Sequence, residues 1–199
     1  APDADFNGSD VFEVQVSDGV LTDVVTVNVT VEAVNDAPVI TQGAGPLTKN
    51  VAEDGSATWT AGELNATDAD FGDVLTWSAS TTATNGVATV SGTGAAPATF
   101  TYAPDPDFTG SDSFEVEVTD GVLTDVVTVN VTVVPVGDAP VITQVGPLAA
   151  TMSEDGAPTA WAAPDLNATD ADFGETLTWS VSTVASNGVA TVSGTGAAP

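Results

Sequence analysis

Carboxylate side chains dominate the polar chemistry of this chain. Its 199 residues include 28 Asp and Glu, a single basic residue, Lys49, and neither His nor Cys. The chain therefore lacks a Ser-His-Asp triad, a thiolate nucleophile, a disulfide, and the nitrogen and sulfur ligands of zinc and iron–sulfur sites. The remaining ligand atoms are carboxylate, amide and hydroxyl oxygens, which suit calcium or magnesium.

The sharpest chemical motif is the acidic turn Ala66-Thr67-Asp68-Ala69-Asp70-Phe71-Gly72-Asp73, which recurs from Ala168 to Glu175. Two carboxylates separated by one residue can bind the same ion, and the glycine permits the turn. Clustered carboxylates repel one another, and a divalent cation is their natural counter-charge in a chain with one lysine. The plainer interpretation is a polar turn whose Asp side chains cap the backbone.

The balance of charge narrows the range of partners. The net charge is −27, so the chain offers no cationic surface for phosphate groups. We therefore expect neither nucleic-acid binding nor attraction to an anionic membrane. No apolar stretch approaches the ~18 residues of a membrane span, and no signal peptide is visible at Ala1. Hydrophobic residues make up 42% of the chain, which is enough for a folded core.

The sequence repeats itself at a period of about 102 residues. Ala1-Pro2-Asp3 recurs as Ala103-Pro104-Asp105, and the run from Asp18 to Thr26 recurs unchanged from Asp120 to Thr128. This period is too long for a solenoid repeat but matches a whole β-sandwich domain. The predicted organisation is the C-terminal part of one repeat, a complete repeat, and the N-terminal part of the next, over 1–35, 36–137 and 138–199. We expect this to be a window onto a longer array.

Alternating β-branched and aromatic residues predict an all-β fold. Phe114, Val116 and Val118 alternate with polar residues, and so do the valines from 127 to 133. Helical periodicity is missing, so we expect tandem immunoglobulin-like sandwiches of antiparallel strands. Asn85-Gly86 fits a tight turn with positive φ. Strands of the complete repeat are expected near 38–42, 56–60, 74–81, 86–92, 98–103, 112–119 and 124–134.

Four tryptophans raise a different possibility. Trp59, Trp77, Trp161 and Trp179 could stack on sugar rings, as in a carbohydrate-binding module. Trp77 and its copy Trp179 lie mid-strand, however, where a sandwich normally buries a tryptophan. The paired carboxylates could in principle hydrolyse a glycoside. Because they recur in every repeat and lie in turns rather than in a cleft, we do not expect an enzyme.

The ordered motifs resemble a cadherin-like domain, and more closely the cadherin-like tandem repeats of very large bacterial surface proteins and adhesins. They are Asn35-Asp36-Ala37-Pro38, Glu53-Asp54-Gly55, the Asp68-Ala69-Asp70-Phe71-Gly72 turn, Pro106-Asp107-Phe108-Thr109-Gly110-Ser111-Asp112-Ser113-Phe114 and Thr119-Asp120-Gly121. The resemblance covers essentially the whole chain. It implies a sandwich fold with calcium at the junction between successive repeats.

The resemblance also implies ligands for two junctions. The first junction would use Asp3, Asp5, Asn35, Asp36, Asp68, Asp70 and Asp120. The second would use Glu53, Asp105, Asp107, Asp138, Asp170 and Asp172. Asp18 and Glu154 would serve junctions completed outside this window. Gly137 stands where the first linker has Asn35, and Ala33 and Pro135 replace an acidic residue of the cadherin linker.

These expectations describe an extracellular or cell-surface array from a bacterium, stiffened by Ca²⁺ and belonging to a giant adhesin. Its partners would be neighbouring repeats of the same chain, with a host-surface or glycan ligand outside the window. One alternative is a subunit of a self-assembling filament or surface layer, in which other copies complete the half domains. Others are an accessory carbohydrate-binding module of a secreted enzyme, or acidity that merely favours solubility at high salt.

Overall fold

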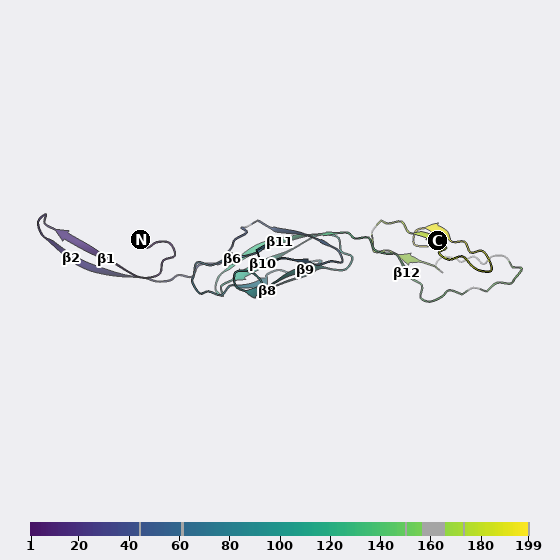
Figure 1. Ribbon diagram of the computed structural model, residues 1–199, viewed down its shortest axis with the longest axis horizontal. Coiled ribbons are helices and arrows are strands. Elements are labelled where there is room, and N and C mark those ends of the chain that lie inside the picture. Colours follow the sequence, from purple (N-terminus) through teal and green to yellow (C-terminus); the bar gives the residue numbers. More distant parts are fainter. Residues whose placement is uncertain (44, 61, 150, 157–165, 173, 199) are drawn as a thin grey trace. The chain divides into compact units, whose positions relative to one another are not determined.

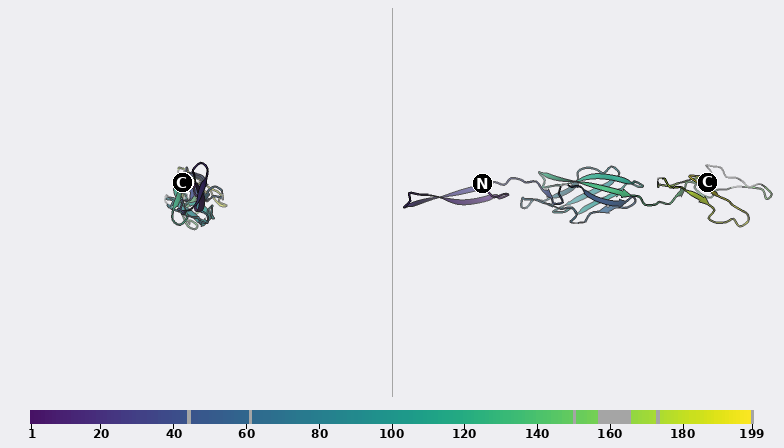
Figure 2. Two further views of the ribbon diagram at one scale, coloured as in Figure 1. Left: turned by 90° about the vertical axis from the view of Figure 1, so that its left-hand side faces the viewer. Right: turned by 90° about the horizontal axis from the view of Figure 1, so that it is seen from above.

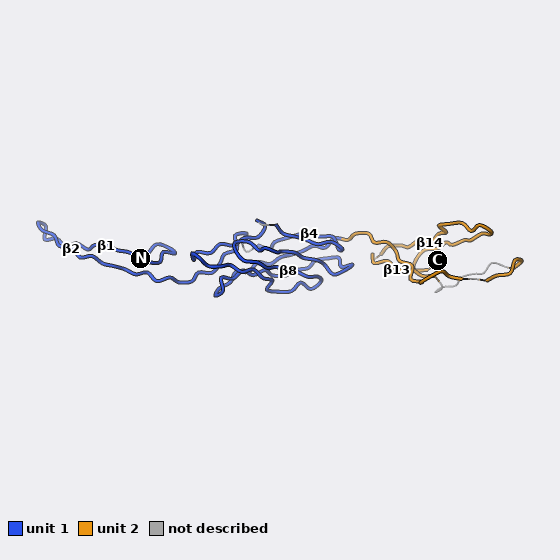
Figure 3. Tube along the Cα trace, turned by 60° about the horizontal axis from the view of Figure 1, so that its bottom comes forward, with its two compact units in different colours: residues 1–134 blue, residues 135–199 orange. Residues whose placement is uncertain are grey.

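The computed structural model describes residues 1–43, 45–60, 62–149, 151–156, 166–172 and 174–198 (Figure 1). The chain divides into two compact units, Ala1–Val134 and Pro135–Pro199, which Figure 3 colours separately. All regular elements of the described residues are strands, which confirms the all-β fold class. Within the same residues, no helix is long and apolar enough to cross a membrane.

The middle repeat supplies nine strands of the first unit. They are β3 (Val39–Ile40), β4 (Leu47–Ala52), β5 (Ala57–Thr58), β6 (Ala66–Thr67), β7 (Thr76–Ala79), β8 (Gly86–Thr93), β9 (Thr99–Pro104), β10 (Gly110–Thr119) and β11 (Thr124–Val134). Seven of them form one sheet in the order β4-β11-β10-β7-β8-β9-β5, while β3 and β6 pair with each other. The right-hand view of Figure 2 shows the strands of this repeat in two layers.

Two strands differ from the sequence-based expectation. β4 and β6 were not expected, and β4 runs parallel to β11, with pairs from Val129↔Leu47 to Val134↔Ala52. A fully antiparallel arrangement is therefore wrong for this pair. The sequence of β4, Leu-Thr-Lys-Asn-Val-Ala, has little apolar alternation. Hydrogen bonding to β11, rather than its own pattern, makes this segment a strand.

The core of the middle repeat lies beneath β10 and β11. Phe114, Val116 and Val118 of β10 are at most 2% exposed, as are Val127, Val129, Val131 and Val133 of β11. Phe114 packs against Phe100 and Tyr102, with ring centroids 6.3 and 5.9 Å away. Alternate residues of both strands therefore face one interior, as the period of two predicts.

Gly86 is required for a reason that the sequence did not show. The expected turn with positive φ at Asn85-Gly86 is wrong, because neither residue has a positive φ and Gly86 begins β8. A Cβ at Gly86 would lie 2.5 Å from the carbonyl oxygen of Ala103 and 2.7 Å from the Tyr102 ring. The glycine thus allows β9 and the buried tyrosine to approach the backbone closely.

The hairpin at the start of the chain repeats the pairing of β10 and β11. β1 (Gly8–Ser17) and β2 (Thr22–Val31) pair from Gly8↔Val31 to Ser17↔Thr22. This register equals that of β10 and β11, which runs from Gly110↔Val133 to Thr119↔Thr124. β1 and β2 form a two-stranded sheet to which no other described strand is hydrogen-bonded (Figures 1 and 2).

The second unit contains four short strands. They are β12 (Val141–Ile142), β13 (Ala168–Thr169), β14 (Thr178–Ser180) and β15 (Ser193–Thr195). β12 pairs with β13, and β14 pairs with β15 in the register Thr178↔Thr195 to Ser180↔Ser193. These pairs copy β3 with β6 and β7 with β8, where Thr76↔Thr93 and Ser78↔Ser91 are partners.

Candidate metal centre

The acidic turn after β6 gathers three carboxylates. One oxygen from each of Asp68, Asp70 and Asp73 lies within 4.8 Å of the other two. The backbone N–H of Asp70 donates to Oδ1 of Asp68 at 2.9 Å, which closes the turn. The second oxygen of this carboxylate, Oδ2 of Asp68, is buried and has no hydrogen-bond partner. An unpaired buried carboxylate oxygen is costly, so this atom fits a cation.

The electrostatics of the turn also favour a bound cation. Burial and the negative charges of Asp70, Asp68 and Asp120 raise the pKa of Asp73 above its ordinary value. A raised carboxyl pKa means that the site resists further negative charge. A divalent cation would reverse this effect, because it stabilises every ionised carboxylate around it.

The linker before the middle repeat is hydrogen-bonded to this turn. The backbone N–H of Asp36 donates to Oδ2 of Asp70 at 2.7 Å. The side-chain amide of Asn35 donates to Oδ2 of Asp120 at 2.9 Å and to the carbonyl of Asp36 at 3.1 Å. The linker therefore contacts both acidic turns at this end of the middle repeat.

Asp120 lies in the turn that joins β10 to β11. Its Oδ1 accepts the backbone N–H groups of Val122 and Leu123 at 2.6 and 2.7 Å. The bonds from Leu123 and Val122, together with the one from Asn35, lower the pKa of Asp120. Asp120 is thus ionised at neutral pH and adds a fixed negative charge beside the linker.

Asp3 and Asp5 reach the same region from the other side of the linker. Both line a pocket of about 290 Å³ whose wall also includes Asp36 and Asp70. Asp5 has a φ of 58°, a left-handed conformation that Asp tolerates in turns. The structure thus brings the predicted residues of the first junction into one region, although their role as ligands remains a prediction. They are Asp3, Asp5, Asn35, Asp36, Asp68, Asp70 and Asp120.

The residues predicted for the second junction fall in both compact units. In the second unit, the N–H of Asp138 donates to Oδ2 of Asp172 at 2.6 Å, just as Asp36 donates to Asp70. Asp170, Asp172 and Glu175 again place carboxylate oxygens within 4.8 Å of one another. Oδ2 of Asp170 is buried without a hydrogen-bond partner, like its counterpart in Asp68. The acidic turn therefore recurs in geometry as well as in sequence.

The other residues predicted for that junction belong to the first unit. Glu53 is 4% exposed, and its N–H donates to the carbonyl of Val134 at 3.1 Å. Asp105 and Asp107 are exposed, and Asp107 has the same φ of 58° as its copy Asp5. Asp18 and Glu154, predicted for outer junctions, are also exposed.

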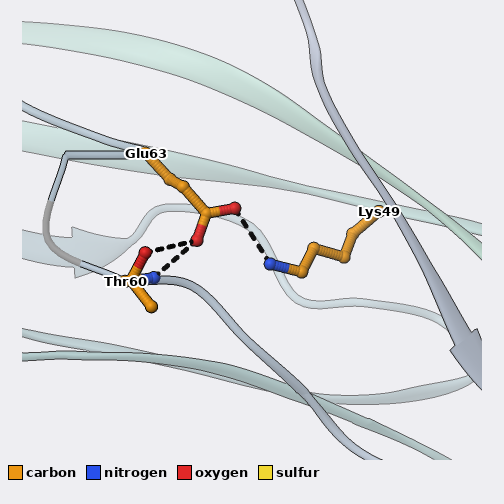
Figure 4. Close-up of polar contacts among 3 residues, drawn as sticks. All are labelled: Lys49, Thr60 and Glu63. Carbon is orange, nitrogen blue, oxygen red and sulfur yellow. Dashed lines mark hydrogen bonds and ion pairs between the residues drawn. The ribbon is translucent and has the colours of Figure 1, made fainter.

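The single lysine does not neutralise the acidic turns. Its Nζ lies 2.9 Å from Oε1 of Glu63, whose other oxygen accepts the N–H and hydroxyl of Thr60 at 2.7 and 2.8 Å (Figure 4). The Thr60 N–H and the Lys49 ammonium lower the pKa of Glu63 to about 2. The chain's one basic side chain is thus already paired, and the acidic turns have to find their counter-charge in solution.

Comparison with protein families shows which family this chain is related to. The sequence model of the family described as "bacterial cadherin-like domain" matches residues 35–135, which are half of the chain. The chain belongs to this bacterial cadherin-like family. The predicted resemblance is confirmed, and the middle repeat is a cadherin-like repeat. None of the curated proteins compared with the chain matches it.

Several solved structures are similar to the chain at low identity. One holds extracellular cadherin domains 1–4 of protocadherin gamma B7, with 20% identity, a TM-score of 0.47, and coverage of 89% of this chain and 45% of that one. Another holds EC1–3 of mouse clustered PcdhgC3, with 18% identity, a TM-score of 0.46, and coverage of 94% and 64%. The endo-fucoidan hydrolase MfFcnA4 gives 21% identity, a TM-score of 0.38, and coverage of 70% and 21%. The chain spans less than two thirds of the length of each.

The tryptophans of the cadherin-like repeat are core residues. Trp77 is 2% exposed, and its Nε1 donates to the carbonyl of Gly94 at 2.9 Å, which confirms its predicted burial. Trp59 is 7% exposed and stacks on Phe100 at 4.1 Å, so neither ring is free for a sugar. Trp179 is half-buried, and Trp161 lies outside the described residues.

The sequence-based ligand set left out three acidic residues that the structure places at the candidate metal centre. Asp73 and Glu175 join the two carboxylate groups, and Glu32 lines the pocket with Asp3 and Asp36. The signal for Asp73 and Glu175 was present, because both end the repeated acidic motif at the same position. Glu32 stands next to the linker without a copy one period later, where Val134 is found.

Proposed function

We propose that the chain is a non-catalytic, calcium-stiffened segment of an extracellular bacterial adhesive or structural array. The observation that carries this proposal is the buried, unpartnered Oδ2 of Asp68, next to Asp70 and Asp73, in a turn to which the linker is hydrogen-bonded. The same unpartnered atom recurs at Asp170. Two copies of one turn, each with a carboxylate oxygen that lacks a partner, support a repeated cation site.

The oxygen-only donor set fits a hard divalent cation. Asp68, Asp70 and Asp73 would hold the cation. Four further carboxylates lie in or beside the linker and could add ligand oxygens: Asp3, Asp5, Asp36 and Asp120. When bound, calcium would supply positive charge and several coordination bonds to oxygens from separate segments. Two hydrogen bonds position the linker beside this site. The Asn35 side chain donates to Asp120, and the N–H of Asp36 donates to Asp70.

Stiffening follows from the removal of repulsion. Without a cation, the carboxylates clustered at this end of the middle repeat repel one another, as the pKa of Asp73, raised by burial and by Asp70, Asp68 and Asp120, indicates. With the cation bound, moving the linker away from the acidic turns would break coordination bonds and leave their carboxylates without a counter-charge, so the linker would be held in place. At ~100 times its dissociation constant, a ligand stabilises the folded state by about 2.7 kcal/mol per site. A rigid succession of repeats would project an adhesive surface away from the cell.

Calcium titration of the chelator-treated full chain tests the proposal. Calorimetry should show saturable binding, and the melting temperature should rise with calcium. Asp68→Asn should remove the binding event of the first turn, and Asp170→Asn that of the second. Glu117→Gln, on β10 and outside the acidic groups, is the matched control and should bind like the original chain.

The stiffening step needs its own measurement. Small-angle scattering should give a narrower distribution of chain dimensions with calcium than with chelator. Binding without any change in scattering would refute stiffening but leave the site intact. Failure of calcium to bind, or unaltered binding by Asp68→Asn and Asp170→Asn, would refute the metal site itself.

A further inference from the structure

Two short strands of the middle repeat join the linker to the acidic turn. β3 and β6 pair only with each other among the described strands. β3 follows the linker residue Asp36, and β6 leads directly into Asp68. Residues 36–40 and 66–73 therefore form one structural piece, the clip. Three carboxylates of the candidate metal centre belong to the clip: Asp68, Asp70 and Asp73.

A further carboxylate near this centre comes from the seven-stranded sheet. Asp120 lies in the turn between β10 and β11. Burial, and then the charges of Asp70, Asp68 and Asp120, raise the pKa of Asp73. Without a cation, like charges on the clip and on the turn therefore push the clip away from the sheet. A cation finds its ligands already in place only if another interaction opposes this repulsion.

Asp125, the second residue of β11, connects the sheet to the clip. Its Oδ2 accepts the backbone N–H of Ile40 at 2.7 Å, and its Oδ1 accepts that of Val126 at 2.9 Å. The bond to Ile40 links two residues that are 85 positions apart in the chain. Asp125 is half-buried and lies five residues after Asp120. The bond thus begins beside the turn that carries the Asp120 charge.

The other end of this bond is fixed in the core. Ile40 is 3% exposed, and its partner in β6, Ala66, is 1% exposed. The N–H of Ala66 also donates to the carbonyl of Ala95 at 2.8 Å. Ala66 stands two residues before Asp68. A restraint on Ile40 is therefore a restraint on the start of the acidic turn.

We propose that Asp125 is a positioning residue of the candidate metal centre, which holds the clip carboxylates beside Asp120 through its hydrogen bond to Ile40 and so raises the affinity for calcium. This inference rests on the proposed function, because it assumes that calcium binds at the clip. Asp125 acts through Ile40 and is not itself a ligand. The bond from Asn35 to Asp120 restrains the clip at its other end. Ligands that are held in place before binding lose less free energy to ordering when the ion arrives.

Calcium titration of the full chain tests the role of Asp125. The Asp170→Asn background leaves only the first acidic turn to bind. In this background, Asp125→Ala removes the acceptor for Ile40 and should weaken calcium binding by roughly ten- to hundredfold, the usual effect of losing an outer hydrogen bond to a metal site. Asp125→Asn keeps an acceptor oxygen without the charge and should recover most of the loss. Asp125→Val lacks an acceptor but suits a strand, so it should bind as weakly as Asp125→Ala.

A matched control separates calcium affinity from stability. Asp112 also accepts backbone N–H groups, those of Thr84 and Asn85, but it lies toward the end of β10 that is remote from the Asp120 turn. Asp112→Asn should lower the melting temperature in chelator and leave the calcium affinity unchanged. Amide hydrogen exchange followed by NMR in chelator gives a second readout. The Ile40 N–H should exchange faster in Asp125→Ala than in Asp112→Asn.

Each contrary result has a distinct meaning. Equal weakening of calcium binding by Asp125→Asn and Asp125→Ala would show that the charge of Asp125, rather than its hydrogen bond, attracts the ion, and would overturn the proposal. A lower melting temperature with unchanged calcium affinity in Asp125→Ala would assign Asp125 a purely structural role and would also overturn it. So would an equal loss of affinity in Asp112→Asn.

Failure of the proposed function would be visible separately. A chain carrying only Asp170→Asn that binds no calcium would refute the metal site before Asp125 is changed, and the role of Asp125 would fall with it. Calcium binding by that chain, together with unaltered binding by Asp125→Ala, would refute the positioning role alone.

Discussion

The chain contains two β-hairpins with nearly the same sequence and the same register in different surroundings. β10 and β11 lie inside a seven-stranded sheet, where Phe114 and Val129 are almost completely buried. β1 and β2 pair only with each other among the described strands, and the equivalent Phe12 is half exposed. The comparison shows that the two hairpins share one register, whereas burial of the apolar face depends on the strands that pack against it.

The acidic residues of the two hairpins differ in the same way. Asp112 is 6% exposed and accepts hydrogen bonds from Thr84, Asn85 and the Tyr102 hydroxyl. Burial alone would raise the pKa of Asp112, but these bonds lower it. The equivalent Asp10 is exposed and bonds to the N–H of its neighbour Val11 at 2.8 Å. One residue type thus serves as a buried structural anchor in one hairpin and as a solvated surface group in the other.

The largest expected effect is on the aromatic pair. Phe114→Ala should lower the free energy of unfolding by about 3–5 kcal/mol, because it leaves a cavity beside Phe100 and Tyr102. Phe12→Ala should change it by less than about 0.5 kcal/mol, because the Phe12 side chain is half exposed. Denaturant titration followed by tryptophan fluorescence measures both. Equal losses would mean that the first hairpin is buried after all.

A smaller difference is expected for the aspartates. Asp112→Ala should cost about 3 kcal/mol, because buried N–H groups and the Tyr102 hydroxyl lose their acceptor. Asp10→Ala should be close to neutral. Asp112→Asn keeps one carbonyl oxygen and should fall between the two. If Asp112→Ala were as harmless as Asp10→Ala in the same denaturant titration, its hydrogen bonds would not stabilise the fold.

The hairpin turns should differ in their response to calcium. Asp120 and Asp18 both accept two backbone N–H groups of their own turn, but Asp120 also accepts from Asn35. Asp120→Asn should weaken calcium binding about tenfold, which is about 1.4 kcal/mol of lost linkage. Asp18→Asn should leave the calorimetric titration unchanged. If Asp18→Asn weakened calcium binding and Asp120→Asn did not, the metal site would not lie beside the linker.

The smallest expected effect belongs to the ion pair that accompanies β4. The pKa of Glu63 falls from its ordinary value of 4.5 to about 2, through the Thr60 N–H and then Lys49. Because the folded-state pKa is depressed, the stabilisation is complete above about 4.5 and is lost as the pH falls toward 2. The difference in melting temperature between the original chain and Glu63→Gln should therefore shrink across this range. A constant difference would show that the carboxylate charge is not involved.

Much of the fold could be predicted from particular residues. The alternation around Phe114 and Val129 predicted long strands and their buried face, and the position of Trp77 predicted its burial. β4 could not be predicted, because its residues are mostly polar and its pairing with β11 supplies the order. The sequence predicted a turn with positive φ at Gly86, but the glycine is needed because Tyr102 packs against its backbone. Tyr102 lies on a strand 16 residues away in the chain, so this contact could not be predicted.

The candidate metal centre, too, could be predicted from the sequence only in part. The repeated acidic turns and the Asn-Asp linker were visible as spacing, and the family relationship named Asp68 and Asp70 as candidates. The hydrogen bonds from the linker and the unpartnered oxygen of Asp68 could not be read from the sequence. They depend on where the chain places residues more than 30 positions apart.

By itself, the sequence determined the repeat, the strand periodicity and the positions of the long strands, because these can be seen in the order of residues along the chain. The tertiary structure decided which of two near-identical hairpins has a buried face, which aspartate is an anchor, and which carboxylates share a site. The physical reason is that burial and charge clustering belong to the segments lying across from a residue, and those segments are distant in the chain.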